Sequence, residues 1–299
     1  MNPDLRRAAL AAGTTGGILM MLLAMLIFAA NDTLAKWLIG SFHVGQILVL
    51  RSVAGLVVLS PFLVRLGPAP LRRAPRPGLQ LLRVALSTLE VALFFRALFD
   101  LPLADTIAIY MAAPIYVTAV SPFLLKERVG WRRWTAVGVG FCGVLLALGP
   151  GLAAPSVGMA CAVIGSFAYA LYLVTTRLLA GTHNTVLAFN QLTAALVFGL
   201  VLVAIQGWAH TDATDALLLA SLGVGSLAGN LCVNRSLRLA PASVVVPYQY
   251  TLIAWGLIFG AAVFGEVMDT RMLAGTAIII GAGLFIFLRE QQLRRRGAR

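Results

Sequence analysis

Charged side chains inside apolar stretches are the first candidates for chemistry in this sequence. Asp32, Arg51 and Glu90 each interrupt a run of apolar residues long enough to cross a lipid bilayer. An ionised group in the hydrocarbon interior costs roughly 2.5–3.5 kcal/mol on insertion scales, so it usually marks a pathway, a binding site or a proton carrier. Lys36 follows Asp32 by four residues, and we expect these two side chains to pair on one helix face.

The three intramembrane charges are predicted to lie at the same depth. Each is about seven or eight residues from the outer end of its segment, which places it roughly 10–12 Å below that boundary at a rise of 1.5 Å per residue. One interpretation is a charged gate or substrate site, in which Asp32 or Glu90 carries a coupling proton. The other is a static ion network that ties three helices together. Both interpretations stay open at this point.

A second group of candidates is polar or aromatic and lies within other apolar segments. Tyrosine combines an apolar ring with a polar tip and suits a cavity for an aromatic or amphipathic solute, although it also serves in interfacial belts and in helix packing. Proline removes a backbone hydrogen bond and is expected to interrupt a helix in mid-membrane. The cavity candidates of this group are Tyr110, Pro114, Tyr169, Asn190, Asn230, Tyr248 and Gln249.

The elements that must position these residues are membrane-spanning helices. Apolar residues make up 60% of the 299 residues and charged residues only 11%, and the mean hydropathy is +0.91. A soluble domain usually has about 25% charged residues, and a spanning helix needs about 20 mostly apolar ones. We therefore predict an all-α integral membrane protein with ten transmembrane helices. The predicted spans are about 17–38, 44–65, 79–98, 102–125, 133–149, 157–179, 185–206, 215–236, 242–264 and 272–288.

The basic residues predict the orientation of these spans. The net charge is +12, yet 19 of the 23 Lys and Arg residues fall in segments that lie inside if the N-terminus is inside. The positive-inside rule describes this bias, so we expect both termini in the cytoplasm. The net positive charge is then explained by the orientation in the membrane, and we expect no nucleic-acid partner. We expect the basic inner loops to contact anionic lipid.

The second half of the chain repeats part of the first. Five residues recur at one offset of 139 (235 − 96): Arg96, Leu98, Pro102, Glu127 and Arg132 return as Arg235, Leu237, Pro241, Glu266 and Arg271. Five spans in each half, an odd number, give the two halves opposite orientations. We predict an inverted repeat of residues 1–150 and 151–299, which is the plan of many secondary transporters. Glu127 and Glu266 are interpreted as structural locks of their loops.

Short motifs in both halves resemble a known family. The first half contains Leu101-Pro102-Leu103-Ala104, Pro114, Lys126-Glu127-Arg128, Gly138 and Gly143, and the second contains Ala240-Pro241-Ala242, Gly265-Glu266, Gly275 and Gly281. Asn31-Asp32 with Lys36, and Arg51, occur in the first half alone. This pattern resembles the EamA-type members of the drug/metabolite transporter superfamily over nearly the whole chain. The resemblance implies two five-helix halves and transport of amino acids, vitamins, nucleotide-derived metabolites or toxic cations.

These observations lead us to expect a secondary transporter that moves a small organic metabolite by alternating access, such as an amino acid, a vitamin or a nucleotide-derived compound. The alternatives are a membrane scaffold or receptor without transport activity, and an intramembrane enzyme. An enzyme would need clustered His, Asp or Cys side chains, whereas His43, His183 and His210 are scattered. The sequence contains no nucleotide-binding loop, and its cysteines (Cys142, Cys161 and Cys232) have no metal-ligand spacing, so we expect no cofactor and no metal.

Overall fold

The fold is known from a computed structural model, which describes residues 3–67, 69–72, 75–125, 130–149, 156–179, 181–240, 245–267 and 269–297. Within these residues every regular element is a helix. The first half contains α1 (Pro3–Leu38), α2 (Val44–Leu66), the short α3 (Ala69–Arg72), α4 (Pro77–Asp100), α5 (Leu103–Tyr110), α6 (Ala113–Leu124) and α7 (Trp131–Leu148). The second half contains α8 (Val157–Leu178), α9 (Asn184–Gln206), α10 (Ala213–Leu239), the 3-10 helix η2 (Val246–Tyr250), α12 (Thr251–Phe264) and α13 (Thr270–Gly297).

Seven helical segments of the described chain are long and apolar enough to cross a membrane. This finding confirms the prediction of an all-α membrane protein. Three of the predicted spans do not correspond to any of these seven segments. They correspond to α4, which carries several charges, and to the shorter apolar helices Trp134–Ala147 and Tyr248–Phe264.

Two predicted spans are irregular: the first is interrupted near its middle, and the second changes from 3-10 helix to α-helix without a gap. The predicted span 102–125 consists of α5 and α6, which are separated at Met111 and Ala112, and Pro114 lies in the first turn of α6. In the predicted span 242–264 the 3-10 helix η2, which contains Pro247, continues directly into α12. We call the interruption at Met111 and Ala112 and the junction of η2 with α12 the two helix breaks. Proline has no backbone N–H to donate, so it favours a new helix start over an unbroken helix at these places.

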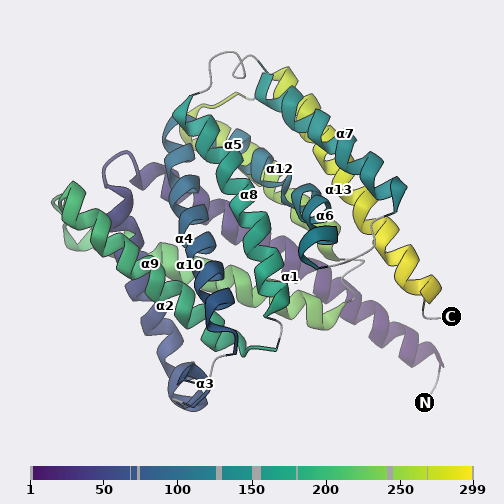
Figure 1. The fold of residues 1–299 in the computed structure, drawn as a ribbon, viewed down its shortest axis with the longest axis horizontal. Helices are drawn as coiled ribbons and strands as arrows, with labels where there is room; N and C mark the ends of the chain where they lie inside the picture. The colour runs from purple at the N-terminus through teal and green to yellow at the C-terminus, as the bar shows by residue number, and fades with distance from the viewer. Residues whose placement is uncertain are drawn as a thin grey trace.

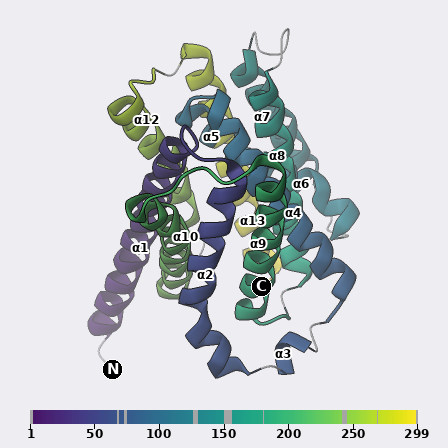
Figure 2. The ribbon, with the colours of Figure 1, turned by 90° about the vertical axis from the view of Figure 1, so that its left-hand side faces the viewer.

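The helices pack as pairs that combine the two halves. α1 lies against α10, α4 against α8, α2 against α9 and α7 against α13, while α5 contacts α12. Figure 1 shows α4 beside α8 and α7 beside α13, and Figure 2 shows α1 beside α10 and α2 beside α9. Glycine permits the closest approaches, because a Cβ added to Gly275 of α13 would lie 2.6 Å from the backbone oxygen of Gly143 in α7.

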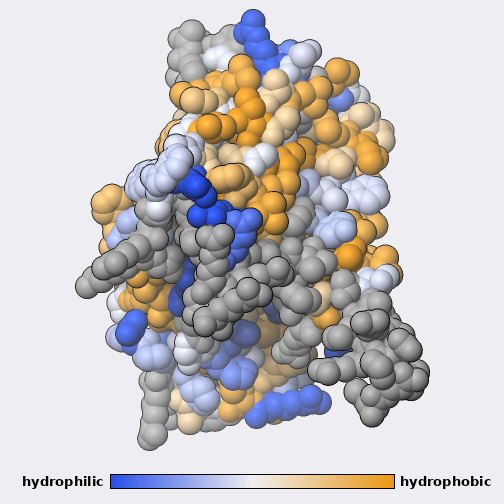
Figure 3. All heavy atoms as spheres, turned by 90° about the vertical axis from the view of Figure 1, so that its right-hand side faces the viewer, coloured by the Kyte–Doolittle hydropathy of each residue, from blue (hydrophilic) through white to orange (hydrophobic). Residues whose placement is uncertain are grey.

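The chain termini lie at one end of this bundle (Figure 1). We call the end where α1 begins and α13 finishes the terminal end, and the opposite end the distal end. Figure 3 faces the side that carries both termini, where hydrophobic side chains cover the upper part and hydrophilic side chains gather in the middle and lower part. The backbone that connects α12 to α13 turns at the distal end, where Gly265 adopts φ +66°, a left-handed conformation that glycine tolerates best.

Candidate functional site

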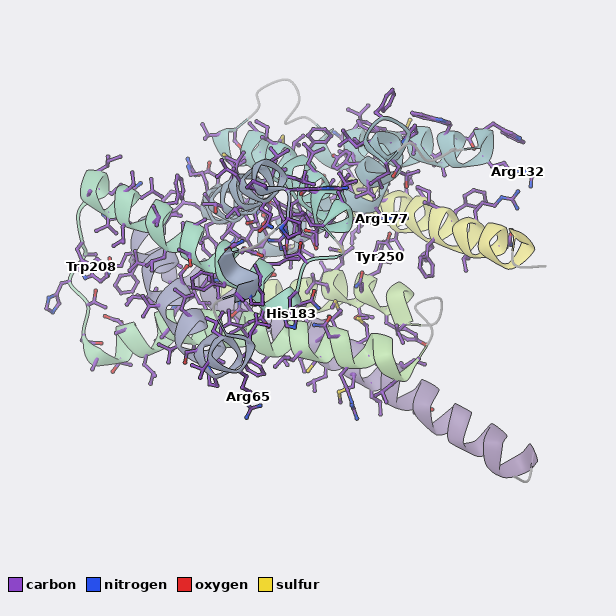
Figure 4. The ribbon with its side chains drawn as sticks, turned by 60° about the horizontal axis from the view of Figure 1, so that its bottom comes forward. Arg65, Arg132, Arg177, His183, Trp208 and Tyr250 are labelled. Carbon is purple, nitrogen blue, oxygen red and sulfur yellow. The ribbon has the colours of Figure 1, made fainter. Side chains whose placement is uncertain are left out.

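A cavity of about 130 Å³ lies between the two helix breaks. Tyr110 and Pro114 line it from the first break, and Gln249 and Tyr250 line it from the second. The remaining lining residues are Met111, Ala113, Tyr169, Leu173, Gly283, Leu284 and Phe287. Figure 4 shows Tyr250 in the interior of the bundle, with Trp208 and Arg132 at opposite ends. A cavity framed by interrupted helices is the form that substrate sites take in many secondary transporters.

A second cavity of about 280 Å³ adjoins the first and extends toward the terminal end. The two share Pro114, Leu173, Gly283 and Phe287 as lining residues. The second also reaches Leu125 and Arg177, which stand at the C-terminal ends of α6 and α8. Together the cavities extend from the helix breaks toward the terminal end.

Three tyrosines form a row beside the first cavity. The ring centroid of Tyr169 is 6.3 Å from that of Tyr110 and 6.1 Å from that of Tyr172. The rings of Tyr169 and Tyr172 are stacked. Phe94 meets Tyr110 edge to face at 5.0 Å. Aromatic faces of this kind attract another flat ring by stacking, which favours an aromatic solute.

The predicted intramembrane charges lie next to this aromatic group. Asp32, Arg51 and Glu90 are half-buried, and the charges of both carboxylates act on the Arg51 guanidinium. Arg51 donates a hydrogen bond to Ser226 Oγ (3.0 Å), and no ion pair within 4.0 Å connects it to Asp32 or Glu90 in the described part of the chain. The Tyr110 hydroxyl donates to the backbone oxygen of Glu90 (3.3 Å), so the charged group and the cavity adjoin.

Lys36 has a different partner from the one that the sequence predicts. Its Nζ pairs with Glu266 Oε1 at 2.6 Å, not with Asp32, and also donates to the backbone oxygen of Leu101 at 2.5 Å. The other carboxylate oxygen of Glu266 accepts a hydrogen bond from the backbone N–H of Leu103 at 2.8 Å. The prediction was wrong because the turn after α12 brings Glu266 across the end of α1. We call Lys36, Glu266 and the backbone of Leu101 and Leu103 the distal latch.

The other three predicted candidates lie away from the cavity. Asn190 donates to Gln80 Oε1 at 2.8 Å, and Tyr248 packs partly buried against a core cluster that includes Met21. Asn230 is exposed and donates to the backbone oxygen of Ser226 in its own helix. Glu127 and Pro241, the repeat partners of Glu266 and Pro102, lie outside the described residues.

Arg83 is a polar centre that the sequence analysis did not single out. It is 4% exposed and donates hydrogen bonds to Thr176 Oγ1, the backbone oxygen of Leu187, the Tyr172 hydroxyl and Gln191 Oε1. These acceptors come from α8 and α9, so one guanidinium joins three helices. Its position between the apolar residues Leu82 and Val84 was a signal in the sequence for a buried arginine. The sequence analysis instead counted it among the basic residues that predict the orientation of the spans.

Comparison with known proteins identifies the family. A profile of the EamA-like transporter family matches residues 15–149 and again residues 156–288. The chain belongs to the EamA-like transporter family. The family and the names of the relatives identify a transporter and not an enzyme, and they place this EamA-like protein among carriers of small metabolites.

Several relatives cover nearly the whole chain. A riboflavin transporter of Vibrio cholerae is 29% identical over 285 residues, which are 94% of this chain and 95% of the relative. An S-adenosylmethionine uptake transporter of Rickettsia prowazekii is 24% identical, with 92% and 94% covered. A solved crystal structure with 18% identity superposes with a TM-score of 0.62, covering 95% of this chain and 99% of the other, so the two share the fold.

In the described part of the chain, no group of three or more His, Cys, Asp or Glu side chains is arranged to hold a metal ion. What the site offers chemically is stacking, hydrogen bonding and a small group of charges. These properties suit recognition of an organic solute.

Proposed function

We propose that this EamA-like transporter moves a small metabolite with a flat heteroaromatic ring across the membrane, and that riboflavin is the first substrate to test. The observation that carries the proposal is the cavity between the helix breaks, which Tyr110 and Tyr169 line. A tricyclic ring can stack on such faces while its polar atoms bond to nearby side chains such as Gln249. The riboflavin transporter named among the relatives supports this choice.

A second candidate is S-adenosylmethionine, the substrate in the name of other relatives. It combines an adenine ring with a sulfonium cation. Two carboxylates, Asp32 and Glu90, stand near a single cation, Arg51, so the charged group is net negative when all three are ionised. This charge balance favours a cationic solute over a neutral one if the substrate reaches that group.

Alternating access is the mechanism we propose for this movement. The two cavities lead from the helix breaks to the terminal end, whereas the distal latch closes the opposite end with an ion pair and two hydrogen bonds to backbone groups. The conformation described here is then open toward the terminal end. Release of the latch and closure of the second cavity would expose the same site on the other side.

An inverted repeat of two five-helix halves, 1–150 and 151–299, is the architecture that we propose for this motion. α5 with α6, and η2 with α12, each count as one interrupted span in a total of ten. The packing pairs support the repeat: if α1 corresponds to α8 and α4 to α10, the contact of α1 with α10 has its counterpart in that of α4 with α8. The two family matches, one in each half, agree with this division.

We also propose that the terminal end faces the cytoplasm of a bacterium and that the chain lies in its inner membrane. Both ends of the chain lie at that end, and basic residues are concentrated in the segments that the positive-inside rule assigns to the inside (Figure 1). Anionic lipid headgroups would then contact exposed arginines such as Arg65 and Arg132. Protons are the coupling ion that we propose, with Glu90 or Asp32 as the carrier.

Uptake into proteoliposomes tests the proposed function. Purified protein is given labelled riboflavin or labelled S-adenosylmethionine, with and without an inward proton gradient. We expect saturable uptake of one of them, which the gradient increases. Tyr169→Leu should weaken the apparent affinity roughly 2- to 10-fold through lost stacking, whereas Tyr116→Leu, which removes a tyrosine outside the cavity lining, should not. No uptake of either compound would contradict the proposed substrates.

A further inference from the structure

Two tyrosines that line the cavity have their hydroxyl groups seated against glycines of neighbouring helices. Tyr110 is the last residue of α5, and its hydroxyl lies against Gly165 of α8. Tyr250 is the last residue of η2, and its hydroxyl lies against Gly283 of α13. Each interrupted span thus contributes one tyrosine to the cavity wall, and each tyrosine has a glycine beneath its hydroxyl.

Neither glycine position has room for a side chain while the tyrosine stays in place. A Cβ at Gly165 would lie less than 3.0 Å from the Tyr110 hydroxyl oxygen and 3.1 Å from both Tyr110 Cζ and Leu93 Cβ. A Cβ at Gly283 would lie less than 3.0 Å from the Tyr250 hydroxyl oxygen and 3.0 Å from its Cζ. Real Cβ atoms essentially never approach other heavy atoms below 3.0 Å, so the tyrosine must move if either glycine becomes alanine.

The cavity is the side toward which these rings can move. Tyr110 is confined elsewhere by the edge-to-face contact with Phe94 and by its hydrogen bond to the Glu90 backbone oxygen. Gly283 is buried and lines both the first and the second cavity, so Tyr250 displaced from it would enter the place where the two meet. A cavity of about 130 Å³ cannot lose the volume of part of a phenol ring without a change in the solutes that it admits.

We propose that Gly165 and Gly283 are specificity-determining residues, which set the width of the substrate cavity by seating Tyr110 and Tyr250 in the walls. This inference rests on the proposed function, because it takes the cavity between the helix breaks as the substrate site. Neither glycine contacts the solute through a side chain. Each acts through the tyrosine that it accommodates.

The first test measures the width of the cavity without reference to any substrate. Leu173, which lines both cavities, becomes the single cysteine in a chain whose native cysteines are replaced, and its modification by a small and by a bulky methanethiosulfonate is timed. Gly165→Ala and Gly283→Ala should each slow the bulky reagent about tenfold relative to the small one, the scale of discrimination that one misfitted group produces in a pocket. Gly281→Ala is the matched control, since a Cβ there meets nothing within 4 Å.

Removal of the hydroxyl separates displacement of the ring from general damage to the fold. Tyr110→Phe added to Gly165→Ala, and Tyr250→Phe added to Gly283→Ala, leave closest approaches of 3.0–3.1 Å, which small shifts can relieve. We expect each double variant to recover most of the bulky reagent's rate. An unchanged rate in both alanine variants, or no recovery in either double variant, would overturn the proposal.

The second test uses riboflavin uptake in proteoliposomes. If the wild type transports riboflavin, the two alanine variants should lose uptake about tenfold and the double variants should regain it, while Gly281→Ala should stay normal. Alanine variants that retain normal uptake would overturn the role in specificity. If the wild type transports no riboflavin, the proposed substrate fails, and the cysteine rates still decide whether the glycines set the cavity width.

Discussion

Glu266 joins three segments of the chain through one carboxylate. It pairs with Lys36 at the end of α1, accepts a hydrogen bond from the first backbone N–H of α5, and follows directly after the turn that ends α12. The side chains of Lys36 and Glu266 are only 14% and 16% exposed. A partly buried ion pair with additional hydrogen bonds resists separation, because either charge left alone would lack solvation.

Removal of the latch should favour opening of the distal end. In Lys36→Met, spin labels at the exposed positions Trp37 and Val267 should show a longer or broader distance distribution than in the wild type. Double electron–electron resonance measures this distribution. Arg96→Met is the matched control, because it removes an ion pair (Arg96–Asp100) that lies within one helix and does not cross the latch. Identical distributions in Lys36→Met and the wild type would show that the latch does not hold this end closed.

Arg51, Asp32 and Glu90 should act on one another although no direct ion pair connects them. Removal of Arg51 leaves two carboxylates in a half-buried setting without their cation, which for a truly buried pair costs roughly 3–5 kcal/mol. We therefore expect Arg51→Ala to lower thermal stability or transport more than Arg51→Ala combined with Glu90→Gln. A double-mutant cycle measures the coupling, since independent sites give additive effects. Additivity for both carboxylates would contradict a shared charged site.

At the scale of elements, the start of α8 is attached to the end of α4 by Asp100. This carboxylate pairs with Arg96 at 2.9 Å and accepts a hydrogen bond from the backbone N–H of Gly158 at 2.8 Å. Asp100 lies two residues beyond the end of the predicted membrane span 79–98. The adjacent Arg96 guanidinium holds the pKa of Asp100 below its usual value of 3.8.

A lowered pKa in the folded state makes Asp100 stabilising when it is ionised. Its contribution is present above the usual pKa and disappears as the pH falls through the folded-state value. Asp100→Asn should therefore lower the free energy of unfolding by roughly 0.5–1 kcal/mol at neutral pH, the scale of a charge at a helix N-terminus. Thermal unfolding in detergent across a pH series measures the difference, which should vanish at acid pH. A difference that persists at all pH values would mean that the side-chain shape, and not the charge, matters.

At the scale of the whole molecule, the proposed orientation assigns Trp208 and Arg132 to opposite sides of the membrane. Both side chains are exposed, and they lie at opposite ends of the bundle (Figure 4). Single cysteines at these positions in a cysteine-free chain should differ in intact cells: a membrane-impermeant thiol reagent should label position 208 and spare position 132. Labelling of both after the cells are opened is the control. The reverse pattern would place the terminal end outside.

The amino-acid sequence by itself determined the class of fold and the class of function. Apolar runs of membrane-spanning length can satisfy their backbone polar groups in lipid only as helices or closed barrels, and their lengths suit helices. The motif pattern around Pro102, Pro114 and Gly265-Glu266 was sufficient to recognise the family. The match of the family profile to both halves confirms that assignment. Ionisable residues in apolar segments are rare enough that Asp32, Arg51 and Glu90 could be picked out from residue type alone.

The tertiary structure decided which of these residues meet. Helical spacing made Asp32 the nearest partner of Lys36, but the turn at Gly265 brings Glu266 to it from 230 residues away (266 − 36). Asn190 and Asn230 carry a side-chain amide, as the cavity residue Gln249 does, yet Asn190 bonds to Gln80 and Asn230 is exposed. Gly165, Gly283 and Arg83 have no sequence signal of their role, because what they do depends on which atoms of other helices lie beside them, and only packing determines that.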